Sequence, residues 1–155
     1  MKIALGSDHG GFVLKQVIAG FLKENDYDYT DFGTFDAVSV DYPDYALQVA
    51  EAVAQSTCTR GILICGTGIG IGIAANKVPG VRAALCSDTF SARAAREHND
   101  ANILTIGERV VGPGLALDIV QMWLESEFSG GRHSKRLDKI RAIEEKYSKQ
   151  QGMGG

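Results

Sequence analysis

The sequence has few cysteines, no long apolar run and no strong net charge. Its three cysteines form no C-x-x-C pair and leave an odd thiol, so we expect a reducing cytoplasmic setting without disulfides or a zinc framework. No stretch of about 18 apolar residues is present, which argues against a membrane-spanning helix. Apolar residues begin directly after Met1-Lys2, so we expect no signal peptide. The net charge of −3 gives no global attraction to nucleic acid or membranes, and neither is expected as a partner.

Several familiar site motifs are also missing. A dinucleotide-binding G-x-G-x-x-G would need glycine at position 71, where the chain has Ile71, and no G-K-[ST] phosphate loop occurs. No His, Cys and carboxylate cluster has the spacing of metal ligands, so we expect neither a metal nor a cofactor. A receiver-type signalling domain would need further acidic residues beside Asp8, whose neighbours are His9 and glycines.

Short apolar runs alternate with amphipathic helical patterns along the whole chain. This alternation predicts an α/β sandwich with a parallel sheet, although it does not determine the strand order. The 155 residues suit one compact domain over 1–149, and we expect residues 150–155 to be disordered. Five strands are predicted, over residues 2–7, 29–32, 61–65, 81–86 and 102–106.

One stretch combines a buried strand, a glycine-rich loop and a helix start. Residues 60–65 end in Cys65, and glycines follow at positions 66, 68, 70 and 72 before a helical pattern at 73–77. Glycines let the backbone turn sharply and leave amide groups uncovered, and a helix start adds positive partial charge. The stretch therefore suits an anion-binding loop with one thiol. A tight turn around a structural cysteine fits the same residues equally well.

Polar residues follow three of the predicted strands directly. They are Asp8-His9, the loop from Cys65 to Gly72, and Arg109. Ligands of open parallel sheets bind outside the carboxyl ends of the strands, so these three groups share the favoured edge. Each also has a structural explanation, since Asp8 can cap a helix and His9 and Arg109 can be surface residues. Their convergence on one edge favours a site.

His98 belongs to the opposite edge, because it precedes the fifth strand. A strand of five to six residues separates the two edges by about 17–20 Å. His98 therefore does not reach the Cys65 loop of its own chain. Either it is structural, or it completes the site of a partner subunit, which predicts a two-fold dimer with shared sites.

The C-terminal segment is basic and has a helical pattern over about 132–147. Arg132 and Arg136 are four residues apart, which places both on one face of a helix, and paired guanidinium groups suit a phosphate. A solvated basic helix is the alternative. The same helix carries an apolar stripe, so we expect it to contact the partner subunit; the stripe is Leu137, Ile140, Ile143 and Tyr147.

Five segments in order resemble the type B ribose-5-phosphate isomerases, whose wider family includes galactose-6-phosphate isomerase subunits. The resemblance extends from about residue 3 to 147 and implies a Rossmann-like, three-layer α/β fold with a five-stranded parallel sheet and a C-terminal helical tail. It also implies a homodimer with shared active sites, or a tetramer. The segments are residues 6–12 (GSDHGGF), 41–43 (DYP), 61–77 (GILICGTGIGIGIAANK), 97–100 (EHND) and 130–133 (GGRH).

The resemblance assigns roles to individual residues. It implies metal-free interconversion of ribose 5-phosphate and ribulose 5-phosphate through an enediolate, with Cys65 as the base that moves a proton between C1 and C2. Some members have glycine at that position and glutamate at the position of Ile71, so this chain resembles the cysteine type. His98 of the partner subunit would assist ring opening. The implied substrate-contacting residues are Asp8, His9, Gly66, Thr67, Gly68, Ile69, Gly70, Asn99, Arg109, Arg132 and Arg136.

Three other functions fit part of the sequence. An isomerase of a six-carbon aldose phosphate, such as allose or galactose 6-phosphate, would use the same residue types in a larger pocket. A non-catalytic phosphosugar-binding protein would need neither Cys65 nor His98. A redox thiol protein is the least favoured, since no resolving cysteine lies near Cys65 in the sequence.

Overall fold

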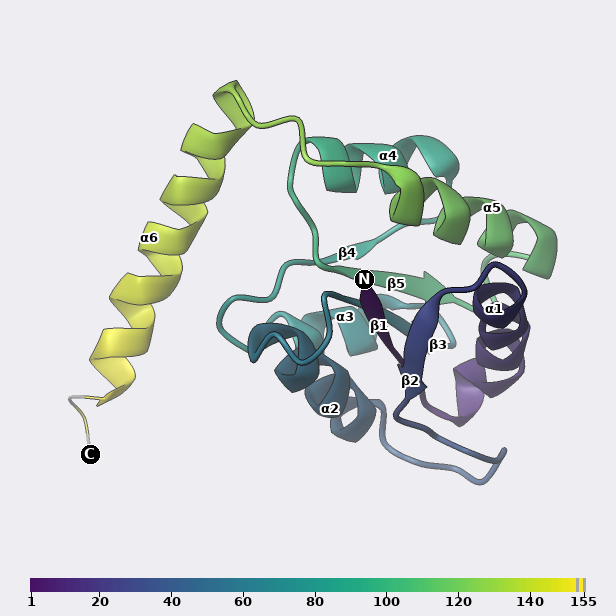
Figure 1. Cartoon of the computed structure of the whole chain (residues 1–155). Helices are drawn as coiled ribbons and strands as arrows, with labels where there is room; N and C mark the ends of the chain where they lie inside the picture. The colour runs from purple at the N-terminus through teal and green to yellow at the C-terminus, as the bar shows by residue number, and fades with distance from the viewer. Residues whose placement is uncertain (153, 155) are drawn as a thin grey trace.

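The computed structural model describes residues 1–152 and 154, and its centre is a parallel five-stranded sheet (Figure 1). The strand order is β2-β1-β3-β5-β4, which the sequence pattern did not determine. Every residue of the central β3 is buried, as expected for a short apolar run inside a sheet. The strands are β1 (Lys2–Ser7), β2 (Asp28–Asp31), β3 (Arg60–Cys65), β4 (Ala83–Leu85) and β5 (Ile103–Gly107).

Helices cover both faces of the sheet, which confirms the predicted α/β sandwich. On one face lie α1 (Phe12–Glu24), α4 (Thr89–Glu97) and α5 (Pro113–Glu125); on the other lie α2 (Tyr42–Ala54) and α3 (Ile69–Ala75). Alternate residues of β3 supply the two cores, because successive strand side chains point to opposite faces. Ile62 and Ile64 pack towards α1 and α5, whereas Leu63 and Cys65 pack towards α2 and α3.

Two predicted boundaries differ from the structure near glycines. The helix after Cys65 begins at Ile69 instead of residue 73, because Gly68 at φ +76 turns the chain immediately into α3. The fourth strand is shorter than residues 81–86. Gly80 adopts φ +86 and the amide of Val81 is used in a turn bond to Val78, so sheet pairing starts only at Ala83.

The last helix, α6 (Arg132–Gly152), lies at one side of the sandwich in Figure 1. It is longer than the predicted 132–147 and includes residues 150–152. No glycine or proline occurs from Arg132 to residue 151, which explains the extension. Residues 153 and 155 lie outside the described part of the chain. Leu137 is buried, and Glu144 accepts the Gly80 amide at 3.1 Å, which fixes α6 beside the approach to β4.

The outer part of the α6 stripe remains exposed in the single chain. Ile143 and Tyr147 are 61% and 56% exposed, and Ile140 is 46% exposed. Across residues 1–152 and 154, no helix is both long and apolar enough to cross a membrane.

Candidate active site

The thiol of Cys65 lies where β3 turns into α3. The side chain is 5% exposed, and the amide of Gly68 donates a hydrogen bond to its Sγ at 3.1 Å. Only glycine fits at position 68, because φ is +76 and a Cβ would lie 2.8 Å from the carbonyl carbon of Ile106. The loop therefore directs a main-chain N–H at the sulfur, where it can stabilise negative charge.

The three loops that follow β1, β3 and β5 meet around this thiol. The amide of Asp8 donates to Ile64 O at 3.3 Å, and the amide of Arg109 donates to Gly66 O at 3.0 Å. A third bond, from the amide of Glu108 to the carbonyl of Cys65, is also 3.0 Å long. Main-chain bonds between neighbouring strand ends thus assemble this edge.

Asp8 and His9 form the wall beside the Cys65 loop. Asp8 is 7% exposed, and its Oδ1 accepts the Gly11 amide at 3.1 Å, so it does cap the short 3-10 turn His9–Gly11. The Nδ1 atom of His9 accepts the Val40 amide at 3.1 Å. In the neutral ring the proton is therefore on Nε2, which is left as a donor.

Arg109 and Tyr42 border the glycine loop from two sides. A Cβ at Gly66 would lie 3.5 Å from the guanidinium of Arg109, and a Cβ at Gly70 would lie 2.7 Å from the ring of Tyr42. Tyr42 is 40% exposed, and the sequence analysis gave it no role although it lies in the 41–43 segment that carries the family resemblance. The sequence feature that could have indicated a role for Tyr42 is its position at the start of α2, a helix that begins at the same sheet edge as the three loops.

His98 lies at the C-terminal end of α4 and stacks on His133 of α6. The two ring centroids are 4.5 Å apart, and the planes are inclined by 15°. The amide of Ser129 donates to Glu97 O at 3.0 Å, which brings the start of α6 to this position. Partial burial lowers the pKa of His133, and the neighbouring His98, Arg132 and Arg136 lower it further. The stacked partner His133 was missed by sequence reasoning.

The candidate residues therefore form two groups at opposite edges of the sheet. The register pairs Gly61 with Ile103 and Cys65 with Gly107, so β5, about 16 Å long at about 3.3 Å per residue, separates them. We call the groups the Cys65 half-site and the His98 half-site. The Cys65 half-site comprises Asp8, His9, Cys65, the loop Gly66, Thr67, Gly68, Ile69 and Gly70, and Arg109; the His98 half-site comprises His98, Asn99, Arg132 and Arg136.

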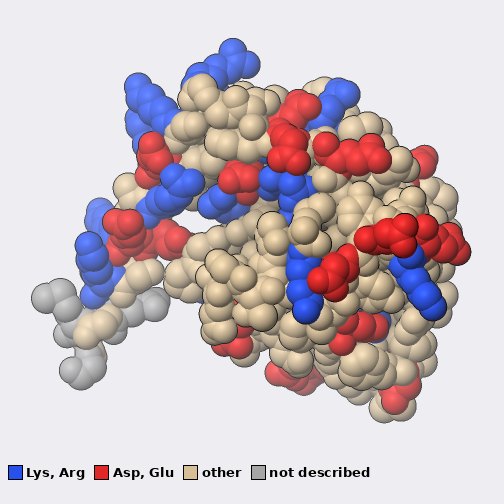
Figure 2. Space-filling view, in the orientation of Figure 1, with Lys and Arg blue, Asp and Glu red and all other residues tan. Residues whose placement is uncertain are grey.

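Charges of both signs lie along α6. Figure 2 shows Lys and Arg side chains gathered along α6 with carboxylates between them, so the helix does not present one continuous basic face in this view. Among the described residues, no group of three or more His, Cys, Asp or Glu side chains has an arrangement that could hold a metal ion.

Known proteins match the chain over almost its whole length. A sequence model of the ribose/galactose isomerase family matches residues 3–140. Ribose-5-phosphate isomerase B of Escherichia coli is 52% identical over 145 residues, covering 94% of this chain and 97% of that protein. D-erythrulose-4-phosphate isomerase of Pectobacterium atrosepticum is 43% identical over 142 residues, with coverages of 90% and 93%. The solved structure of ribose-5-phosphate isomerase B from Clostridium thermocellum is 64% identical, covers 95% of this chain and 99% of that chain, and has a TM-score of 0.94.

Proposed function

Because the chain belongs to the ribose/galactose isomerase family, we propose that it interconverts ribose 5-phosphate and ribulose 5-phosphate. One observation carries the proposal beyond family membership. A thiol with an amide directed at its sulfur lies among polar groups at the carboxyl end of the sheet, where parallel α/β folds bind ligands. Aldose–ketose isomerisation needs such a base together with donors for a developing oxyanion.

Proton transfer between C2 and C1 is the task of Cys65. As a thiolate it takes the C2 proton of the open-chain aldose, and the C2–H electrons form the C1–C2 double bond of the enediolate while O1 takes the negative charge. A proton then passes from O2 to O1, and the proton held by Cys65 is delivered to C1 to give the ketose. Within residues 66–70, the Gly68 amide donates to Cys65 Sγ and the Ile69 amide donates to Thr67 Oγ1, so the amides of Gly66, Thr67 and Gly70 are the candidate donors to the enediolate oxygens. A well-placed donor of this kind contributes about 2.7–4 kcal/mol to the transition state.

Ring opening needs a second acid–base group, because ribose 5-phosphate is a furanose at rest. A proton must leave the O1 hydroxyl and one must reach the ring oxygen, and histidine titrates in the required range. We assign this step to His98 of the partner subunit, because the Cys65 half-site of the same chain lies at the other edge of the sheet. The active enzyme is then a homodimer with two shared sites. The exposed α6 stripe gives the partner an apolar surface to cover.

The phosphate is assigned to the cationic groups of both half-sites. Arg109 borders the glycine loop, and the Nε2–H of His9 is free to donate on the same side. Arg132 and Arg136 come with the partner's His98 half-site. Planar guanidinium forks suit phosphate oxygens, which accept several hydrogen bonds at once.

The decisive experiment is an assay for ribulose 5-phosphate from ribose 5-phosphate with a chelator present. We expect turnover in the wild-type protein and none in Cys65→Ala, which should still bind the sugar phosphate in calorimetry. Activity of Cys65→Ala would refute the assignment of the base. Tight binding without turnover in the wild type would favour a non-catalytic phosphosugar-binding protein.

Shared sites are tested by mixing two inactive proteins. In a heterodimer of Cys65→Ala and His98→Asn subunits, one of the two sites keeps both residues, so part of the activity should return. No recovery, with heterodimers confirmed by mass spectrometry, would contradict sharing across the dimer. Rates on four-, five- and six-carbon aldose phosphates then decide the substrate class. All three are worth testing, because the matching family is named for both ribose and galactose and a relative acts on the four-carbon D-erythrulose 4-phosphate.

A further inference from the structure

The His98–Asn99 turn is exposed and leaves α4 through a residue with a left-handed backbone. His98 and Asn99 both face solvent, and the following Asp100 has φ +44. This region is uncommon for residues other than glycine, although aspartate and asparagine tolerate it. An exposed turn of this kind keeps an acid–base side chain in one orientation only if contacts from outside the turn fix its backbone.

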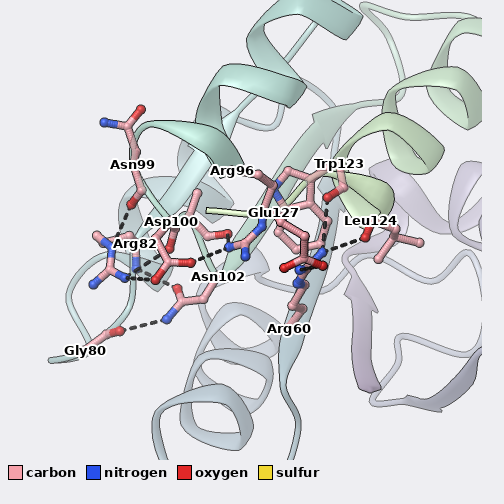
Figure 3. A network of polar contacts seen from close by, with 11 residues as sticks. Arg60, Gly80, Arg82, Arg96, Asn99, Asp100, Asn102, Trp123, Leu124 and Glu127 are labelled. Atoms are coloured by element: carbon pink, nitrogen blue, oxygen red, sulfur yellow. Dashed lines mark hydrogen bonds and ion pairs between the residues drawn. The ribbon is translucent and has the colours of Figure 1, made fainter. Parts of the chain in front are cut away.

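Two arginines supply those contacts from opposite sides (Figure 3). Arg96, in the last turn of α4, donates to the carboxylate of Asp100 at 2.9 Å and to Ala101 O at 2.7 Å. Arg82, which precedes β4, donates to Asn99 O at 3.0 Å, to Asp100 O at 3.0 Å and to the Asp100 carboxylate at 3.3 Å. Figure 3 shows the Asp100 carboxylate between the two guanidinium groups, with the Asn99 side chain directed away from Arg82.

The Asp100 carboxylate also balances buried positive charge. The Arg96 side chain is 7% exposed and lies 5.9 Å from the ring of Trp123, on which Arg60 packs at 5.4 Å. Within the described residues, Asp100 is the only carboxylate in an ion pair with Arg96. Burying a charge is costly unless it is paired, so loss of this carboxylate obliges Arg96 to move and the turn to move with it.

We propose that Asp100, held by Arg82 and Arg96, is a positioning residue that orients His98 and Asn99 for opening of the sugar ring. The proposal rests on the proposed function and deepens it, because it assigns residues that act on His98 without touching the substrate. Each carboxylate oxygen of Asp100 contacts one of the two arginines. Asp100 therefore acts on the reaction through the backbone of the turn that carries His98, and not through contact with the substrate.

The test variant is Asp100→Asn, which keeps the side-chain shape and tolerates the left-handed backbone but removes the charge. Turnover of ribose 5-phosphate requires ring opening. Exchange of the C1 hydrogen of ribulose 5-phosphate in D2O does not, because the phosphate occupies O5 and leaves no hydroxyl to close a furanose. We expect kcat on ribose 5-phosphate to fall at least about tenfold, and the exchange rate to stay within about twofold, since misplacement of one reacting group affects only its own step.

Glu127→Gln is the matched control. Glu127 pairs with Arg60 at 3.7 Å in the same network but is 83% exposed and does not contact the turn, so both rates should be unchanged. Arg82→Lys is a second test variant in case Asp100→Asn does not fold. It keeps the charge but loses the fork that joins Asn99 to Asp100, so the same selective loss should appear at smaller size.

Selective loss of ring opening in either variant supports the proposal. Equal loss of both rates, loss of neither, or failure of both variants to fold would overturn it, because the network would then be only structural. His98→Asn separates this proposal from the function on which it rests. If the wild type shows neither isomerisation nor C1 exchange, the proposed function fails. If the wild type shows both, and His98→Asn loses ring opening selectively while Asp100→Asn and Arg82→Lys do not, only the positioning role fails.

Discussion

The two half-sites are held in place by different kinds of interaction. In the Cys65 half-site, main-chain hydrogen bonds join the loops that follow β1, β3 and β5, and the sulfur itself receives a main-chain amide. In the His98 half-site, main-chain bonds to Arg96 O and Ala95 O close the end of α4, but the further contacts come from side chains: Arg82 and Arg96 around Asp100, and the stacked ring of His133.

This difference implies different sensitivities. Main-chain bonds inside a sheet respond to backbone geometry and available space but hardly to salt or to charge substitutions. Ion pairs near the surface are screened by salt and depend on single side chains. The His98 half-site, which we assign to the partner's active site, is therefore the one that ionic conditions can alter.

The largest effect is expected from a methyl group in the main-chain half-site, in Gly68→Ala. The residue has φ +76, and the new Cβ would lie 2.7 Å from Leu85 Cδ1 and 2.8 Å from the carbonyl carbon of Ile106. Left-handed strain and overpacking together should cost about 3 kcal/mol of unfolding free energy. The displaced amide at Cys65 should lower kcat/KM by at least about a hundredfold. Urea unfolding and the isomerase assay measure the two effects.

Gly114→Ala is the control for that substitution. Gly114 lies in the first turn of α5, and no atom lies within 4 Å of the position that an alanine Cβ would occupy. Gly114→Ala should therefore leave activity unchanged and slightly raise the free energy of unfolding. A similar loss in both variants would mean that the loop geometry at Gly68 has no special role.

A second effect tests the ion pair between Lys15 of α1 and Asp31 at the end of β2. Lys15 is fully buried and contacts both carboxylate oxygens of Asp31 at 2.6 and 2.7 Å, and Asp31 also accepts the Gly33 amide. Lys15→Met should cost about 2–3 kcal/mol of unfolding free energy, because Asp31 loses its partner but remains 22% exposed.

The double variant Lys15→Met with Asp31→Asn should recover part of this stability, because the unpaired charge is removed and the acceptor for Gly33 is kept. Unlike Asp100→Asn, neither of these two variants should change the ratio of ribose 5-phosphate turnover to C1 exchange. A selective loss in Lys15→Met would show that charged side chains control both half-sites, and the comparison above would fail.

Much of the fold follows from local sequence signals. The apolar run 60–65, the alternation of short strands with amphipathic stripes, and the glycine breaks define the sandwich, and the structure confirms it. The strand order does not follow, because it depends on which strands pair across long separations. The start of α3 was missed since glycines are poor helix formers, and packing against α2 and β3 overrides that preference.

The candidate site also has a part that the sequence predicts and a part that it does not. The positions of Asp8, Cys65 and Arg109 on one edge, and of His98 on the other, follow from the rule that parallel strands share their carboxyl ends. The residues that hold the His98 turn could not be found in this way, because Arg82 and Asp100 meet only through the fold. The left-handed backbone of Asp100 is also not predictable from the sequence, which shows only that aspartate is a residue type that tolerates this conformation.

A third and smaller effect concerns salt. The side chains of Arg82 and Asp100 are 21% and 33% exposed, so added salt should weaken their contact. In 0.5 M KCl the ratio of ribose 5-phosphate turnover to C1 exchange should fall roughly twofold. The ratio removes the effect of salt on phosphate binding, which both reactions share. The ratio should be insensitive to salt in Asp100→Asn, and an unchanged ratio in the wild type would indicate that the turn does not depend on charge.

The smallest effect is the titration of His133, the ring that supports His98. Partial burial and the nearby His98, Arg132 and Arg136 lower its pKa below the ordinary 6.5. A histidine whose folded-state pKa is lowered contributes stability that is present above the unfolded pKa and is lost as the pH falls through the folded value. NMR titration should therefore give a pKa below 6.5 for His133.

Arg136→Ala should raise this pKa towards the ordinary value, because it removes one of the positive charges that oppose protonation. Lys135→Ala removes a charge from the same helix that is not among the groups lowering the pKa of His133, and should leave that pKa unchanged. If both substitutions shift the pKa equally, the charge around His98 is diffuse along α6. A shift confined to Arg136→Ala would place the charge sensitivity at the stacked pair, in the half-site whose geometry depends on side chains.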